Sequence, residues 1–382
     1  MVDLKNNVKS IYIHIPFCKK ICYYCDFCKI YYNDLIASNY LDELKKEIRK
    51  YYKNETINTL YIGGGTPSSL SVPNLNKLFE IINILKKSND IEFTFECNIE
   101  DINENLLTFL KNGGVNRLSI GVESFNTKNL NFLNRNHANI DIKRKIDLAK
   151  SLGFKNINID LIYAIPNESF EDLKQDIDNF LKLDITHIST YSLIIEPNTI
   201  LNNKKVKNID EELDYKMYEY IKQTLKQNNY IHYEISNFAK VGYESIHNLT
   251  YWNNNYYYGF GLGASGYVND IRYDNTRSIT KYLKGEYRKI QNKLSFNEKV
   301  ENEFILGFRK IKGINIIDFK TKYDINLFDL EIVNKLLQEK KLIYKDNNLF
   351  INEEYLYQEN NILIEFLGIN YEIVKKNKRC YN

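Results

Sequence analysis

Apolar positions along the chain follow two spacings, one typical of strands and one typical of helices. Short runs rich in β-branched and aromatic residues predict strands. The expected strands are 11–15, 59–62, 92–96, 117–121, 156–161 and 187–194. Between them, apolar side chains recur every three or four positions, as Tyr40, Leu44, Ile48 and Tyr51 do, which predicts helices with one buried face. We therefore expect an α/β fold of repeated strand–helix units, with a parallel sheet and outer helices.

Six such units correspond to about three quarters of an eightfold barrel. Periodicity alone leaves two arrangements open, a partial (β/α)6 barrel and a doubly wound sheet. Pro73 stands near the expected start of one helix, and Gly153 is expected to end another.

The pattern changes after about residue 204. Asp210 is placed to cap a helix, and an aromatic, glycine-rich stretch runs from Tyr251 to Tyr267. A helix is then expected over 298–309 and a hairpin over 342–351, an order typical of a winged-helix-like α+β domain. The expected division is a barrel over 1–205, a barrel extension over 206–290 and a C-terminal domain over 291–382.

Composition narrows the classes of protein. The 382 residues are 43% hydrophobic and 26% charged, which is a globular balance and excludes a disordered chain. A net charge of +3 is too mild to predict nucleic-acid binding or a polybasic membrane anchor. The first residues are polar and lack the apolar core of a signal peptide. We therefore expect a cytoplasmic protein with reduced thiols.

Four cysteines lie within eleven residues, directly after the first expected strand. Cys18, Cys22, Cys25 and Cys28 crowd on one loop. Soft thiolates gathered in this way suit an iron–sulfur cluster or zinc. Structural zinc usually takes four ligands from two separated pairs, and no second pair is nearby. The loop therefore predicts a metal centre.

The spacing Cys-x3-Cys-x2-Cys at the end of a first barrel strand resembles the radical S-adenosylmethionine (radical SAM) superfamily. In that superfamily three cysteines hold three irons of a 4Fe-4S cluster, and S-adenosylmethionine chelates the fourth iron. The resemblance implies that Cys18, Cys22 and Cys25 are the ligands. We interpret Cys28 as a neighbouring thiol, with a fourth ligand as the alternative.

Other segments match the superfamily in order, each with polar residues where an expected strand ends. The run Gly63-Gly-Gly-Thr-Pro67 follows the second strand, where the superfamily binds the methionine amino group. The cofactor contacts implied by the resemblance are Tyr12, Gly64, Gly65, Thr66, Glu96, Glu123, Arg135 and Asp160. Glu123 stands where the family usually has Gln, and Ala164 and Asn167 replace glycines.

The ordered motifs resemble one branch, the oxygen-independent coproporphyrinogen III dehydrogenases and the HemW-type heme chaperones. Cys18 lies close to the first residue, and Asp26-Phe27 follow the third cysteine where the dehydrogenases have a fourth. The segment from His247 to Trp252 resembles the His-Asn-x-x-Tyr-Trp motif of the chaperones. These features favour the chaperones.

Besides the cluster and S-adenosylmethionine, this resemblance implies that the protein binds heme. His247 would be an axial ligand of the heme iron, and the aromatic residues after it would pack against the macrocycle. Residue chemistry alone also allows His247 and Trp252 simply to pack the barrel against the C-terminal unit.

The expected function is a radical SAM heme chaperone that delivers heme to a recipient protein. The expected partners are a reductant such as a flavodoxin or ferredoxin, the heme recipient, and a membrane touched peripherally through that recipient. The alternatives are oxidative decarboxylation of coproporphyrinogen III to protoporphyrinogen IX and a zinc-containing winged-helix binding module.

Overall fold

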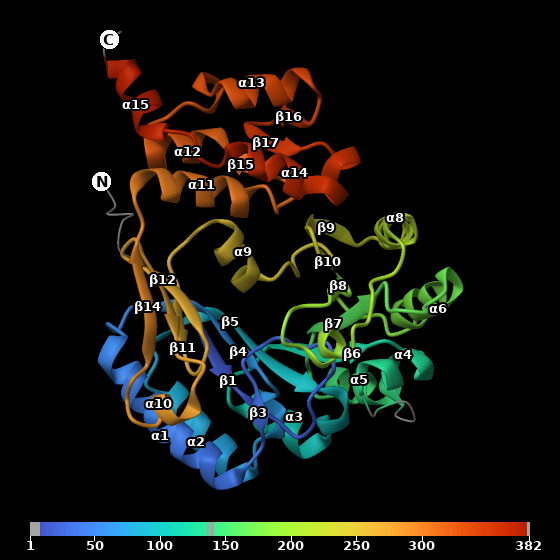
Figure 1. The fold of residues 1–382 in the computed structure, drawn as a ribbon. Coiled ribbons are helices and arrows are strands. Elements are labelled where there is room, and N and C mark those ends of the chain that lie inside the picture. The colour runs from blue at the N-terminus through green and yellow to red at the C-terminus, as the bar shows by residue number, and fades with distance from the viewer. Residues whose placement is uncertain (1–7, 136, 138–140, 380–382) are drawn as a thin grey trace.

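The computed structural model describes residues 8–135, 137 and 141–379. Most of the polar start of the chain, on which the absence of a signal peptide was predicted, lies outside the described residues. Figure 1 shows a curved sheet with helices on its outer side and a separate helical domain above it. Among the described residues, no helix is both long and apolar enough to span a membrane.

The main sheet has nine strands in the order β11-β1-β4-β5-β6-β7-β8-β10-β9. Its strands are β1 (Ser10–Ile15), β4 (Ile57–Gly64), β5 (Lys87–Asn98), β6 (Arg117–Glu123), β7 (Asn156–Tyr163), β8 (His187–Ser192), β9 (Ile231–Glu234), β10 (Asn237–Ala239) and β11 (Tyr258–Phe260). Strands β11 to β8 are parallel, and β10 pairs antiparallel with both of its neighbours, β8 and β9. All six predicted strands are confirmed.

Each strand of the six units lies beside the next one in the chain, with no reversal of order. A doubly wound sheet reverses at a switch point and carries helices on both faces, so the partial barrel is confirmed. Within the described residues β9 and β11 do not pair, and the barrel stays open. The two short strands β2 (Phe17–Cys18) and β3 (Ile30–Tyr31) pair within the loop after β1.

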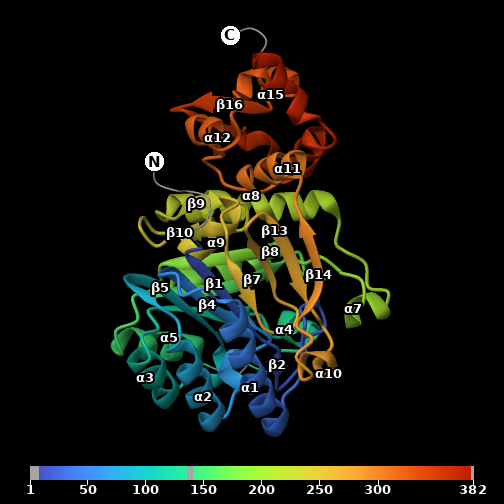
Figure 2. The same cartoon turned by 90° about the vertical axis from the view of Figure 1, so that its left-hand side faces the viewer.

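Helices cover the outer face of this sheet (Figure 2). They are α1 (Asp34–Tyr51), α2 (Val72–Ile82), α3 (Glu104–Asn112), α4 (Thr127–Leu133), α5 (Ile142–Ser151), α6 (Phe170–Leu181) and α8 (Glu211–Gln227). The short helix α7 (Ile200–Asn203) instead lies against the loop after β1, where Leu201 N–H donates to the carbonyl of Tyr23 at 3.1 Å. Asp210 caps α8 as predicted, since its carboxylate accepts from the backbone N–H of Glu212 and Leu213. The buried stripe of α1 includes Tyr40, Leu44 and Ile48, which join the barrel core.

The stretch after α8 folds into elements that its composition did not predict. It contains α9 (Ile246–Trp252), β12 (Ser265–Val268), β13 (Ile271–Asn275), α10 (Ile279–Tyr282) and β14 (Arg288–Lys293). Strand β11 extends the main sheet beyond β1, and β12, β13 and β14 form an antiparallel sheet of their own.

The C-terminal domain has its own apolar core. It contains α11 (Phe296–Gly307), β15 (Ile314–Asn315), α12 (Ile316–Tyr323), α13 (Glu331–Gln338), β16 (Leu342–Lys345), β17 (Asn348–Ile351), α14 (Glu359–Leu363) and α15 (Tyr371–Arg379). The predicted hairpin is confirmed as β16 and β17. The predicted helix over 298–309 begins and ends two residues earlier, because Ser295 forms a capping box with Glu298.

The C-terminal domain joins the barrel through backbone and side-chain contacts. Ile235 N–H donates to the carbonyl of Arg309 at 3.1 Å, so β9 is prolonged by the chain after α11. Glu303 of α11 accepts from the Asn254 amide at 3.2 Å, directly beyond α9. This seam lies next to the site described below.

Candidate functional site: a cysteine loop and a central cavity

The cysteine loop occupies the chain between β1 and α1, at the carboxyl ends of the parallel strands. Tyr23 N–H donates to the carbonyl of Leu133 at 3.2 Å, and the Asn134 amide donates to the carbonyl of Ile21 at 2.8 Å. The loop is therefore fastened across the barrel to the segment after α4. Active sites of barrel folds gather at this end of the strands.

Cys18, Cys22 and Cys25 share one environment. Thr66 Oγ1 donates to Cys18 Sγ, and Arg135 Nη1 donates to Cys22 Sγ, each at 3.7 Å. Burial raises the pKa of Cys18 to about 11 and also raises the pKa of Cys25, and each thiol feels the charge of its cysteine neighbours. The predicted ligands are thus brought together, with donors aimed at two of the sulfur atoms.

Cys28 lies apart from this group. Its Sγ is 3.9 Å from the carbonyl oxygen of Arg277, and it packs against Gly263, where an added Cβ would come within 3.0 Å of the sulfur. Its backbone carbonyl accepts from His14 Nε2 at 2.6 Å. Cys28 therefore faces the stretch after β11.

The glycine turn at the end of β4, Gly63 to Gly65, packs too closely for side chains. An added Cβ would come within 2.7 Å of the Glu96 carboxyl at Gly63, within 2.6 Å of the His14 ring at Gly64, and within 2.8 Å of the Pro16 backbone at Gly65. Gly64 also has φ +120°, which other residues rarely adopt. The sequence therefore needs glycine here for both space and backbone conformation.

Glu96 on β5 points into the barrel beside this turn. Its carboxylate accepts from Tyr61 Oη at 2.8 Å and from Gly64 N–H at 2.9 Å. Burial raises the pKa of Glu96 to about 7, and the nearby charge of Asp160 adds to that rise. Tyr61, which the sequence analysis missed, is therefore a positioning residue for Glu96.

Arg135 connects several of the predicted contacts. Its Nη1 also donates to Asn98 Oδ1 at 3.0 Å, and its Nη2 donates to the carbonyl of Gly121 at 2.8 Å. Glu123 lies 4.0 Å from Nη2 with φ +65°, and burial raises the pKa of Glu123 to about 7 while Arg135 opposes the rise. Asn98, unmarked by any motif, links Arg135 to Thr66.

Asp160 on β7 completes the polar side of the barrel. Its carboxylate accepts from the Asn158 amide at 2.9 Å. Burial raises its pKa, and its charge in turn raises the pKa of Glu96 and Glu123. Three carboxyl groups from separate strands thus face one interior space.

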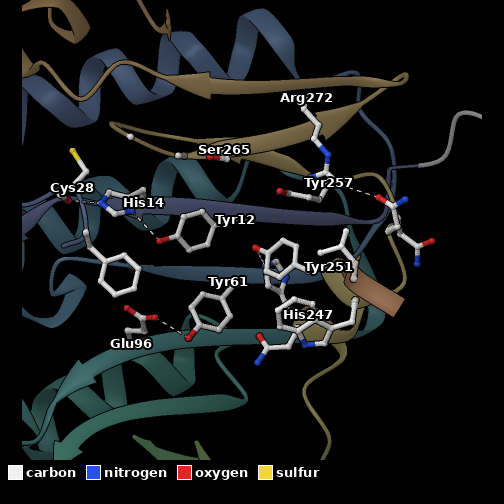
Figure 3. Close-up of a pocket in the computed structure, with 18 of the residues that line it drawn as sticks. Tyr12, His14, Cys28, Tyr61, Glu96, His247, Tyr251, Tyr257, Ser265 and Arg272 are labelled. Atoms are coloured by element: carbon white, nitrogen blue, oxygen red, sulfur yellow. Dashed lines mark hydrogen bonds between the residues drawn. The ribbon is translucent and has the colours of Figure 1, made fainter. Parts of the chain in front are cut away.

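A cavity of about 550 Å³ extends from the cysteine loop toward the C-terminal domain (Figure 3). Tyr12, with its hydroxyl 2.9 Å from His14 Nδ1, lines it beside Glu96. Since the carbonyl of Cys28 accepts from His14 Nε2, Nδ1 accepts from Tyr12. The other end is walled by aromatic residues of α9 and by Leu306 of α11.

His247 lies in the cavity wall with both ring nitrogens engaged. Nδ1 is 2.8 Å from Thr59 Oγ1, and Nε2 is 2.8 Å from Tyr251 Oη. Burial lowers the pKa of His247 to about 3, so the imidazole is neutral. Glu92 of β5 accepts from the His247 backbone N–H at 2.9 Å and thereby anchors the start of α9.

The radical SAM superfamily model matches residues 12–180. A heme chaperone HemW of Lactococcus lactis is 38% identical over 371 residues, which cover 94% of this chain and 97% of that protein. One of Bacillus subtilis is 38% identical over 377 residues, covering 94% and 100%. One of Escherichia coli is 33% identical over 322 residues, covering 81% and 85%.

Among solved structures, the coproporphyrinogen III oxidase of Escherichia coli, described as a radical SAM enzyme, superimposes with a TM-score of 0.83. That match covers 95% of this chain and 90% of the other at 22% identity, so it is a likeness of fold. Together the open barrel and the cysteine loop define a radical SAM protein. Within that superfamily, the chain belongs to the HemW heme chaperone family.

Membership of the superfamily implies a 4Fe-4S cluster and S-adenosylmethionine, and the residues present fit both. Among the described residues no three His, Cys, Asp or Glu side chains form a site for a single metal ion. The buried Nε of Arg135 has no partner, the glycine turn forms a tight cradle, and three soft thiols share one environment. Such a donor set suits a cluster with a polar nucleotide beside it.

Proposed function

We propose that the chain holds a 4Fe-4S cluster on Cys18, Cys22 and Cys25, binds S-adenosylmethionine beside it, and carries heme in the central cavity to a recipient protein. The observation that carries this proposal is one continuous cavity that reaches from Cys28 and Glu96 to His247 and Trp252. Two of the predicted nucleotide contacts, Tyr12 and Glu96, therefore line the same cavity as the predicted heme motif.

The bound cluster can supply single electrons to the sulfonium nucleotide. The residues of this chain prepare that site. Thr66 and Arg135 donate to sulfur atoms, which lowers the cost of thiolate charge. Glu96, fixed by Tyr61, is placed to accept from the amino group of the nucleotide, and Asp160 to accept from its hydroxyl groups.

Heme binding gives His247 its role in this proposal. An iron ligand must be a neutral imidazole with a free nitrogen, and the low pKa of His247 meets the first requirement. Nε2 becomes free when Tyr251 gives up its hydrogen bond. We therefore expect Tyr251 to turn aside as the macrocycle enters, with Trp252 packing against the ring.

The test is heme retention by anaerobically reconstituted protein after gel filtration, read from the Soret band. Wild type should retain heme, His247→Ala should lose most of it, and Tyr251→Phe should bind at least as tightly as wild type. His232→Ala, on β9, is the matched control and should behave as wild type. Absence of retained heme in wild type and His247→Ala alike would reject the proposal.

The remaining partners follow from the same proposal. A one-electron reductant such as a flavodoxin or ferredoxin would load the cluster, and a heme protein would receive the cargo, in the cytoplasm or at a membrane surface reached through the recipient. Nucleic acid has no part in it. Coproporphyrinogen III decarboxylation rests on the likeness of fold alone, and formation of protoporphyrinogen in an anaerobic assay would establish it instead.

A further inference from the structure

Arg272 brings a positively charged guanidinium to the aromatic end of the central cavity. It stands on β13, and its Nη2 donates to Asn254 Oδ1 at 3.0 Å. The guanidinium carbon lies 4.6 Å from the centre of the Tyr267 ring, and the buried Nε has no partner. The side chain of Tyr257 also hydrogen-bonds to the guanidinium. The head group is thus held by an amide, a phenol and a ring, and its Nε–H remains free to donate.

The part of the chain that the structure describes offers Arg272 no carboxylate within ion-pair distance. The acids nearest to it along the chain are engaged elsewhere. Asp270 pairs with Lys299 at 2.8 Å, and Asp274 accepts from Ser265 Oγ at 2.5 Å. Burying a cation beside an apolar cavity costs free energy unless an anion lies next to it. The position of Arg272 therefore favours a ligand that carries a negative charge.

The surroundings define the rest of that ligand. Tyr251, Trp252, Tyr257 and Leu306 line the same end of the cavity, which suits a flat apolar body. A guanidinium matches a carboxylate with two parallel hydrogen bonds. On the basis of the heme binding proposed above, we propose that Arg272 binds a propionate carboxylate of the tetrapyrrole and so fixes its orientation in the cavity.

The carboxylate of S-adenosylmethionine is the other anion available to this cavity. Figure 3 places Arg272 beside Tyr257 and Tyr251, at the opposite end from Cys28 and the cysteine loop. The nucleotide carboxylate would be needed at the cluster end in the proposed site. The position of Arg272 therefore favours the propionate.

The chain supplies its own probe, because Trp252 is its only tryptophan and lines the cavity. Quenching of its fluorescence, measured anaerobically on reconstituted protein, gives the Kd of iron-free protoporphyrin IX and of its dimethyl ester, which lacks the carboxylates. Arg272→Gln should weaken protoporphyrin binding about tenfold or more, the size expected for one charge-assisted hydrogen-bonded pair. It should leave the ester unaffected, and Arg272→Lys should restore part of the loss.

The control is Lys289→Gln, which removes the same charge from an exposed position on β14 and should change neither affinity. Equal affinities of wild type and Arg272→Gln for protoporphyrin would overturn the inference. So would equal losses for protoporphyrin and its ester, or weakened binding of S-adenosylmethionine with protoporphyrin unchanged. Failure of the proposed function itself looks different, since wild type would then bind neither heme nor protoporphyrin.

Discussion

Two residues in the loop after β7 hold backbone conformations that glycine adopts most easily. Ala164 has φ +59° and Asn167 has φ +68°, at positions where the resembled family usually has glycine. The loop thus keeps its left-handed turns without glycine, and Asn tolerates this region better than Ala does.

Asn167→Ala should therefore lower the free energy of unfolding by about 0.5–1 kcal/mol, whereas Asn167→Gly should leave it unchanged or raise it slightly. Asn208, an exposed asparagine outside the left-handed region, provides the control Asn208→Ala, for which no change is expected. Thermal unfolding of the three variants checks this. Equal effects at positions 167 and 208 would contradict the backbone explanation.

The ionisation of Glu96 gives S-adenosylmethionine binding a pH dependence. The pKa of this carboxyl is raised to about 7, so it is largely neutral at pH 6 and largely charged at pH 8. Since the amino group of the nucleotide is a cation, the affinity should rise severalfold between these values. Glu96→Gln should bind more weakly, with a flatter profile. Calorimetric titration measures both, and equal slopes for wild type and variant would remove Glu96 from the contact.

At the scale of elements, the spacing of apolar residues predicted those strands and loops whose structure depends mainly on the local sequence. The six strands are short, almost continuously buried runs rich in β-branched and aromatic residues, and the loop cysteines lie close together in the chain, so both could be predicted. Strands β12, β13 and β14 lie within or after an aromatic stretch without alternation, and their pairing depends on tertiary packing. No local motif marks Glu92 or Arg272. The partner of Glu92 is a backbone N–H 155 residues away, and Arg272 reaches the cavity only through the pairing of β13.

Glu92 offers a direct test of how α9 is held. Its carboxylate accepts from the backbone N–H groups of Ile246 and His247 at 3.0 and 2.9 Å. Glu92→Ala should destabilise the protein by about 1–3 kcal/mol, because two backbone donors at the start of α9 lose their acceptor and that of His247 is buried. It should also weaken heme binding by moving His247.

Glu92→Gln keeps one acceptor oxygen and should show smaller losses in both properties. Denaturant unfolding and heme titration check the pair of variants. Full stability of Glu92→Ala with weakened heme binding would contradict an anchoring role and suggest direct contact instead.

At the scale of the whole molecule, the seam between barrel and C-terminal domain contains an acid that resists ionisation. Burial raises the pKa of Glu234 to about 7, and the nearby carboxyl of Glu359 adds to the rise. A raised carboxyl pKa means stability that is complete below about pH 4.5 and is lost as pH rises through about 7.

The melting temperature should therefore fall by a few degrees between pH 5 and pH 8, and Glu234→Gln should reduce this fall. Glu354→Gln, which alters an exposed glutamate of the C-terminal domain, should leave the fall in melting temperature as in wild type. Other buried acids titrate in the same pH range, so the test compares the pH dependence of the melting temperature in the variants with that in wild type. An unchanged slope in Glu234→Gln would show that the seam is insensitive to this proton.

The most direct measurement is the iron content of anaerobically reconstituted cysteine variants. Wild type and Cys28→Ser should each bind about four irons per chain, with broad absorption near 400 nm (about the range of iron–sulfur proteins). The variant with serine at 18, 22 and 25 should bind almost none. Iron retained by that triple variant, or lost in Cys28→Ser alone, would contradict a cluster held by the three cysteines.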